Sequence, residues 1–197
     1  MAIPVPSSNL PQHLGELLES LMGADVTFNV SGEIFSAHKN VLAARSPVFK
    51  AEFFGEMLEK SSGSVDIKEM EPYVFGAMLR FIYTDAVPEF DKMMEVATTT
   101  LAQHLLVAAD RYGLDRLKVL CERRLAFAID TLTAATTLAL AERHGCSQLK
   151  DKCMEFIAGG SRENLDAVMQ MEGFKDLMLN SPMLLAELLV AAHGTKN

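Results

Sequence analysis

The stretch that decides the fold of this chain is AHKNVLAARSPVF, which runs from Ala37 to Phe49. It leaves a short strand and enters two short helices separated at Pro47, because proline is tolerated at the first position of a helix but breaks its interior. Upstream, apolar residues at 26, 28 and 30 alternate with polar neighbours, and Ser31-Gly32 supplies a two-residue turn. The pattern therefore predicts a hairpin that feeds a pair of helices.

Further elements are read from the same signals on either side of this stretch. Two short helices are expected over 41–45 and 47–54, a third strand over 64–67, and a helix from Pro72 to about Ile82. Everything beyond about residue 96 has helical patterning. We therefore expect an α+β fold, with a small three-stranded mixed sheet flanked by helices and an all-α extension.

The helical half contains an internal repeat at an offset of 32 residues. Six residues recur in order: Ala109, Arg111, Gly113, Leu117, Lys118 and Cys121 as Ala141, Arg143, Gly145, Leu149, Lys150 and Cys153. In each copy the glycine is expected to end a helix in the left-handed conformation. A solenoid usually needs at least about three repeats, so two similar helical layers are the better interpretation.

Composition limits the classes of function. The chain has 197 residues with 26 acidic and 18 basic side chains, a net charge of -8, and its densest basic group, around 116–124, is interrupted by acids. Such a surface repels a phosphate backbone, so no nucleic-acid partner is expected. No signal peptide and no apolar run of about 20 residues is present, so no membrane association is expected and we place the protein in the nucleus, the cytoplasm or both.

No motif in the sequence indicates catalysis or a cofactor. The nearest group to a metal site is His144 with Cys146 and Cys153, but three ligands across a helix end without a fourth make a poor zinc site. Reduced, buried thiols are the better interpretation of these cysteines and of Cys121. We therefore expect no catalytic residue, no metal and no enzyme activity.

Two features suggest recognition of other proteins. Leucines at 10, 14, 17, 18 and 21 form one stripe of a helix that precedes the sheet, which fits either ordinary core or a dimer seam. Near 53–60, large apolar residues stand beside acids at the end of a helix. That mixture suits docking of a partner helix, and the alternative is that Phe53 and Phe54 are core while Met57 and Glu59 extend into the loop.

The order of elements, together with DVTF (25–28), FIYT (81–84), AADRY (108–112) and GFK (173–175), resembles the BTB/POZ domain and BACK (3-box) extension of the MATH-BTB family, which is speckle-type POZ protein-like. The resemblance implies a BTB/POZ domain over 10–128 after a linker over 1–9, and a BACK extension over 129–197. It also implies that the MATH domain is absent, so the chain is either a fragment or a naturally short member.

The resemblance further implies an adaptor that homodimerises and binds cullin-3, which recruits substrates to a cullin-RING E3 ubiquitin ligase for protein ubiquitination. The implied cullin contact is Phe54, Met57, Leu58 and Glu59, and the implied dimer seam is Leu10, Leu14, Leu17, Leu18, Leu21 and Val41. A charged pocket falls on Asp25 and Lys39, which fit a structural role equally well. A short member also has the option of forming heterodimers with related BTB proteins. The alternative function is a ligase-independent oligomerisation scaffold for transcriptional regulators.

Overall fold

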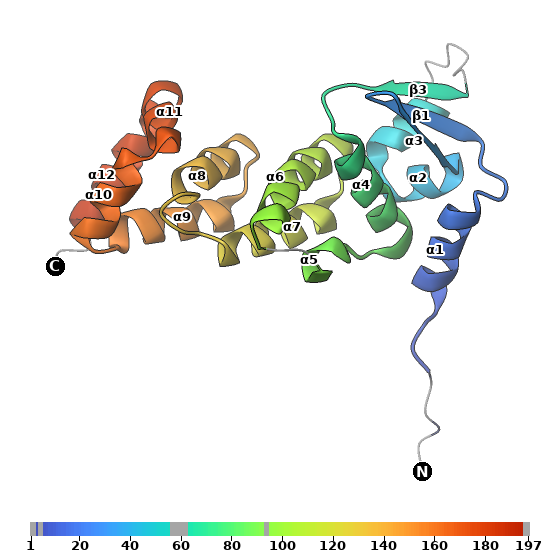
Figure 1. Ribbon diagram of the computed structural model, residues 1–197, viewed down its shortest axis with the longest axis horizontal. Coiled ribbons are helices and arrows are strands. Elements are labelled where there is room, and N and C mark those ends of the chain that lie inside the picture. The colour runs from blue at the N-terminus through green and yellow to red at the C-terminus, as the bar shows by residue number, and fades with distance from the viewer. Residues whose placement is uncertain (1–2, 4–5, 56–62, 93–94, 195–197) are drawn as a thin grey trace. The chain divides into compact units, whose positions relative to one another are not determined.

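The computed structural model describes residues 3, 6–55, 63–92 and 95–194. The chain forms two compact units, one comprising Met1–Met93 with Val107–Leu117 and the other Met94–Leu106 with Lys118–Asn197. The first unit contains the sheet, and the described part of the second is helical (Figure 1). The predicted fold class, an α+β domain followed by an all-helical extension, is therefore confirmed.

The sheet has three strands, β1 (Val26–Val30), β2 (Glu33–Ala37) and β3 (Ser64–Ile67), in the order β2-β1-β3. The hairpin strands β1 and β2 are antiparallel, whereas β1 and β3 are parallel, so the sheet is mixed as predicted. Alternation along β1 buries Val26, Phe28 and Val30 on one face and leaves their neighbours half-buried.

Five helices complete the described part of this unit before residue 93: α1 (Leu10–Ser20), α2 (Lys39–Arg45), α3 (Pro47–Phe54), α4 (Pro72–Thr84) and α5 (Glu89–Lys92). Figure 1 shows α2, α3 and α4 on one side of the sheet. Rings from three elements meet there, because the centroid of Phe28 lies 5.6 Å from that of Phe49 and 5.1 Å from that of Phe75. Burial of these aromatic side chains joins the sheet to α3 and α4.

The break between α2 and α3 is made by Ser46 and Pro47. The Ser46 hydroxyl accepts the N–H of Phe49 at 3.2 Å, which caps α3, and donates to the Tyr112 carbonyl at 2.6 Å. Pro47 occupies the first position of α3, where its missing N–H has no intrahelical partner to lose. The predicted helix pair is thus present, although α2 begins at Lys39, two residues earlier than expected.

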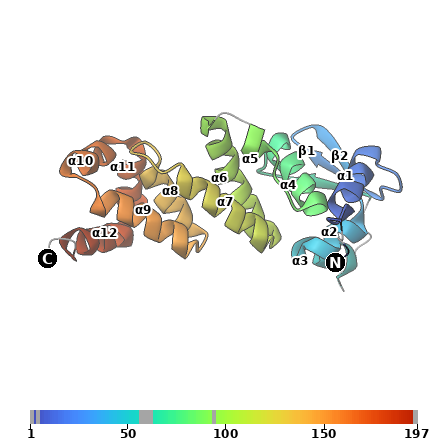
Figure 2. The ribbon, with the colours of Figure 1, turned by 90° about the horizontal axis from the view of Figure 1, so that it is seen from below.

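The remaining helices are α6 (Glu95–Tyr112), α7 (Asp115–Phe127), α8 (Ala134–Arg143), α9 (Ser147–Gly159), α10 (Arg162–Gln170), α11 (Glu172–Asn180) and α12 (Pro182–Gly194). Residues of α6 and α7 contribute to both units. In the second unit α8 packs against α9, and α9 in turn contacts α12 (Figure 2). Their core is built from apolar side chains that include Leu138, Leu149 and Ile157.

The two copies of the 32-residue repeat end their first helix in the same way. Gly113 and Gly145 both have φ 65, and the residue after each glycine donates its N–H to the carbonyl five positions back, at 2.8 Å in both copies. This is the glycine-capped end predicted from the sequence. The copies differ in space, because a Cβ on Gly113 would lie 2.6 Å from Pro47 Cγ whereas Gly145 has nothing within 4 Å.

Because the space around the two glycines differs, a substitution at Gly145 serves as the control for the same substitution at Gly113. We expect Gly145→Ala to lower the free energy of unfolding by about 1 kcal/mol, because alanine is strained in the left-handed region. Gly113→Ala adds a clash with Pro47 and is expected to cost about 2–4 kcal/mol in total. Urea unfolding followed by circular dichroism measures both, and equal losses would contradict the close approach of Gly113 to Pro47.

Candidate interaction site

Helix α1 approaches α4 through its glycine. A Cβ on Gly15 would lie 3.2 Å from Thr84 Cγ2, which is closer than most side chains tolerate. The two helices border a groove of about 350 Å³, to which α1 contributes Gly15 and Leu18 and α4 contributes Arg80 and Thr84. The half-buried residues of α1 are Leu14, Gly15, Leu17 and Leu18, so the side that packs on its own unit includes Gly15 and three of the leucines.

The leucine stripe overlaps the packed side of α1 and extends beyond it to the exposed Leu10. At about 100° per residue, Leu10, Leu14 and Leu17 centre about a third of a turn away from Gly15. No residue of α1 is fully buried: Leu10 is 58% exposed, and Leu14, Leu17 and Leu18 are half-buried. The first unit alone thus leaves part of this apolar stripe in contact with solvent.

Two members of the predicted dimer seam lie outside α1. Leu21 follows the end of the helix in a left-handed conformation with φ 54, and its N–H donates to the Leu17 carbonyl at 3.1 Å. It is 44% exposed, beside Met22 at 73%. Val41 is half-buried on α2. Leu21 therefore extends the apolar surface of α1 beyond the helix end.

His38 joins three separate segments of the first unit. Its Nδ1 lies 2.8 Å from the Tyr83 hydroxyl on α4, and its Nε2 lies 2.9 Å from the Met22 carbonyl in the turn after α1. The Tyr83 hydroxyl also accepts the backbone N–H of His38 at 2.9 Å. One proton arrangement satisfies every group: the tyrosine O–H donates to Nδ1 and Nε2–H donates to Met22. Burial raises the pKa of Tyr83, which keeps this hydroxyl protonated.

The predicted charged pocket has a structural use in this fold. The Asp25 carboxylate accepts the backbone N–H of Lys39 at 2.8 Å and so caps the start of α2. The Lys39 ammonium lies 5.7 Å from the centroid of the Phe53 ring, a cation–π distance. Among the described residues, Asp25 and Lys39 form no ion pair with each other. The capping bond also explains why α2 begins at Lys39.

The predicted cullin contact is only partly within the described residues. Phe54 ends α3 and is 54% exposed, while the adjacent Phe53 is buried against Phe28 and Phe49. Met57, Leu58 and Glu59 lie outside the residues that the structure describes. Of the four predicted residues, Phe54 alone lies within the described part of the chain, where it places an exposed aromatic side chain at the end of α3.

Sequence reasoning missed the contact between Asp85 and two arginines of the same unit. Asp85, with φ 58 at the end of α4, pairs through one oxygen with Arg45 at 2.5 Å and through the other with Arg116 at 2.6 Å. The Arg45 guanidinium also lies over the Phe81 ring. In the sequence Asp85 signals only the end of a helix. All three side chains are partly exposed, so these ion pairs orient the two arginines more than they stabilise the fold.

The cysteines of the second unit are buried free thiols, as expected. Burial raises the pKa of Cys153 to about 12 and raises that of Cys121 as well, so these thiols stay protonated and unreactive. Within the described residues no group of three histidine, cysteine or acidic side chains is arranged to hold a metal ion. In the same part of the chain no helix is long and apolar enough to cross a bilayer.

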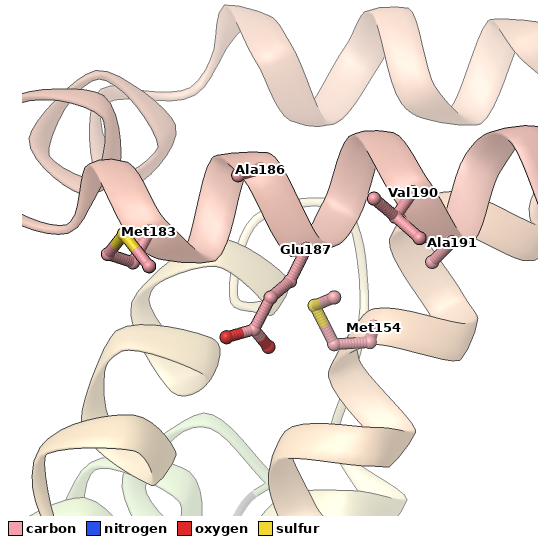
Figure 3. Close-up of a pocket in the computed structure, with 6 residues that line it drawn as sticks. All are labelled: Met154, Met183, Ala186, Glu187, Val190 and Ala191. Carbon is pink, nitrogen blue, oxygen red and sulfur yellow. The ribbon is translucent and has the colours of Figure 1, made fainter.

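A groove of about 430 Å³ lies between α9 and α12 of the second unit. Figure 3 shows its six lining residues, with Met154 on one helix facing Met183, Ala186, Glu187, Val190 and Ala191 on the other. Glu187 pairs with Lys150 at 2.8 Å, and Lys150 also pairs with Glu142 at 2.7 Å. These hydrogen bonds raise the pKa of Lys150 and keep it charged. The single acid of this groove is therefore compensated within the chain.

A mixed sheet covered by helices, with a partly exposed leucine stripe on the first helix, defines a class of protein-interaction modules. The model of the BTB/POZ domain matches residues 14–128, and that of the BPM/SPOP BACK domain matches 133–189. The chain belongs to the BTB/POZ family and carries the BACK extension found in the BPM/SPOP group. The resemblance drawn from the sequence is confirmed.

The curated relatives of this chain include proteins from Arabidopsis thaliana. BTB/POZ and MATH domain-containing protein 3 is 49% identical over 95% of this chain and 46% of its own length. BTB/POZ and MATH domain-containing protein 4 is 44% identical over 98% of this chain and 42% of its own length. The chain thus spans about half the length of these relatives and corresponds to their BTB–BACK part.

The His38 contacts predict unequal effects of removing the hydroxyls of Tyr83 and Tyr112. Tyr83→Phe is expected to lower the free energy of unfolding by about 1–3 kcal/mol, because a buried N–H and the imidazole Nδ1 both lose their partner. Tyr112→Phe keeps the stacking of that ring on Phe49 and is expected to cost less than about 0.5 kcal/mol. Urea unfolding of the two variants measures the difference, and similar losses would contradict the proposed role of the Tyr83 hydroxyl.

Proposed function

We propose that this chain is an adaptor subunit that forms a homodimer through α1 and binds cullin-3, thereby linking substrates to a cullin-RING ubiquitin ligase. Membership of the BTB/POZ family and the relatives with MATH domains support the adaptor role. The observation that carries the dimer is the position of α1, which packs on α4 through Gly15 and leaves its leucines partly in solvent. A second copy that presents the same stripe buries both.

The cullin contact is proposed to begin at Phe54 and to continue through Met57, Leu58 and Glu59. An exposed aromatic side chain beside apolar and acidic residues offers an anchor and a charge that selects orientation. Asp25 and Lys39 are not proposed as part of this contact, because the backbone of α2 and the Phe53 ring already engage them.

Calorimetric titration with an N-terminal fragment of cullin-3 tests the adaptor role. We expect the unmodified protein to bind with a dissociation constant of about 1 μM or lower, and Met57→Ala with Glu59→Ala to weaken binding at least about tenfold. Ile34→Ala with Glu33→Ala is the matched control, because it also truncates one exposed apolar and one acidic side chain, on β2. Absence of binding by the unmodified protein would overturn the proposal and favour a ligase-independent scaffold.

Substitution of the stripe tests the dimer. Leu14→Asp with Leu17→Asp is expected to give a monomer or an insoluble protein, because the seam would bury two unpaired charges. Gln12→Asp with Glu16→Asp places the same residue type on the opposite side of α1 and is expected to leave the dimer intact. Light scattering at concentrations on the order of tens of micromolar reads out the state. An unmodified protein that is monomeric there would contradict the dimer.

A further inference from the structure

The strand β2 forms one edge of the sheet. In the strand order β2-β1-β3 it pairs with β1 alone, and this pairing is antiparallel. A strand at an edge has backbone groups on its outer side that no strand of its own sheet satisfies. The other edge strand, β3, comes shortly after residues 56–62, which lie outside the described part of the chain, and it is left out of the proposal.

The turn that joins β1 to β2 determines which backbone groups of β2 face β1. Ser31 and Gly32 both have positive φ, 49 and 92, as in the type I′ turn of a two-residue hairpin. In that turn the two flanking residues, Val30 and Glu33, form a hydrogen-bonded pair. Every second residue of β2 from Glu33 onward therefore bonds to β1.

The intervening residues, Ile34 and Ser36, turn their N–H and C=O groups to the outside of the sheet. The same alternation is present on β1, because Thr27 donates its N–H away from β2, to the Gly63 carbonyl at 2.8 Å. Among the described residues, no hydrogen bond is found for the backbone groups of Ile34 or Ser36. Residues 34–37 also carry no charge and no proline, which commonly block an edge strand. The outer side of β2 is thus open to a further strand.

The side chains of β2 favour a second copy of β2 as that strand. In a two-fold antiparallel pair, hydrogen bonds between Ile34 of each copy and Ser36 of the other place the two Phe35 residues opposite each other. Phe35 is half-buried, and its ring centroid lies 5.3 Å from that of Phe75. Because aromatic pairs across neighbouring strands stabilise a sheet, this register extends the aromatic cluster of each copy.

The same register avoids a charge clash and covers an apolar side chain. Glu33 lies opposite Ala37 of the other copy, so the two acids do not meet. Ile34 is 66% exposed, on the face of the sheet opposite to Phe35, and it gains Ser36 of the other copy as a neighbour. Two strands of five residues bury less than the roughly 1,200–2,000 Å² of a standard interface, so the contact is weak and forms at high concentration.

We propose that β2 pairs with β2 of a second copy, in the antiparallel register that joins Ile34 to Ser36. This contact goes beyond the proposed adaptor function, because it uses no residue of the α1 seam or of the cullin contact. Each copy then has two different two-fold contacts. Dimers formed through α1 therefore join into larger assemblies as the concentration rises.

Sedimentation equilibrium of the full chain from about 10 μM to about 1 mM tests the contact. We expect species larger than a dimer at the upper end, with a dissociation constant of about 0.1–1 mM for the β2 pair. Ser36→Pro removes an N–H that no described residue accepts, and it is expected to weaken the pair at least about tenfold. Ser36→Ala, the matched control, keeps that N–H and is expected to change the constant less than about twofold.

A second variant tests the contact without proline in β2. Ile34→Lys leaves the backbone intact and brings two like charges close to the two-fold axis, so it is expected to weaken the pair at least about fivefold. Val119→Lys makes the same charge change on α7, at a position with similar exposure, and is expected to leave the pair unchanged. Circular dichroism checks that every variant is folded.

Hydrogen exchange measured by NMR locates the contact on the strand. The outward amide protons of Ile34 and Ser36 are open to water in a single copy, and pairing protects them. We expect exchange at both amides to slow at least about fivefold between about 50 μM and about 1 mM. In Ser36→Pro the amide of Ile34 is expected to exchange at the same rate at both concentrations.

Three results would overturn the proposal. The first is no increase in mass of the unmodified protein up to about 1 mM. The second is an increase that persists in Ser36→Pro and Ile34→Lys, or that leaves exchange at both amides unchanged, because another surface would then be responsible. The third is an equal loss in Ser36→Pro and Ser36→Ala. Failure of the α1 seam is distinguishable, because the unmodified protein would then be a monomer at about 10 μM and a β2 dimer at about 1 mM.

Discussion

The hydrogen bonds of His38 constrain the whole interaction face of the first unit. One imidazole ties the turn after α1 to the start of α2 and to the end of α4, through Met22 and Tyr83. Because Asp25 fixes the first turn of α2 beside it, the strand–helix junction has little freedom to rotate. The direction in which α1 presents its leucines follows from this junction and from the close approach of Gly15 to α4.

The polar contacts of this unit and its apolar core depend on each other. Phe28, Phe49 and Phe75 bring the sheet, α3 and α4 together, and burial of their rings is the main favourable term. Ser46 then sets the angle between α2 and α3 by capping one helix and bonding to Tyr112. The two helices are separate because Ser46 and Pro47 break the helical path at that point.

Most of the fold was predictable because its signals are local. Alternation in β1, proline at the start of α3 and the glycines that end α6 and α8 each determine the conformation of a few neighbouring residues. The contacts that assemble the site are not local, since His38 and Tyr83 lie 45 positions apart and Asp85 joins Arg45 to Arg116. No periodicity in the sequence reveals such pairs. The stripe of α1 was visible as a pattern, but only the structure shows that Gly15 approaches α4 closely and that Leu10 is largely exposed.

Contacts between distant residues also explain why the sequence could not assign Asp25 and Lys39 to either a pocket or a structural role. The structure gives each residue a contact within a single unit, because the Asp25 carboxylate accepts the backbone N–H of Lys39 and the Lys39 ammonium lies over the Phe53 ring. The proposed functions thus depend most on which face of α1 is covered. Double electron–electron resonance on a nitroxide at His13→Cys tests this directly, since His13 is exposed beside the stripe and Cys121, Cys146 and Cys153 are buried from the label. A two-fold seam through α1 predicts a narrow inter-copy distance of about 10–25 Å, one to two helix diameters. Absence of an inter-copy signal in that range would contradict it.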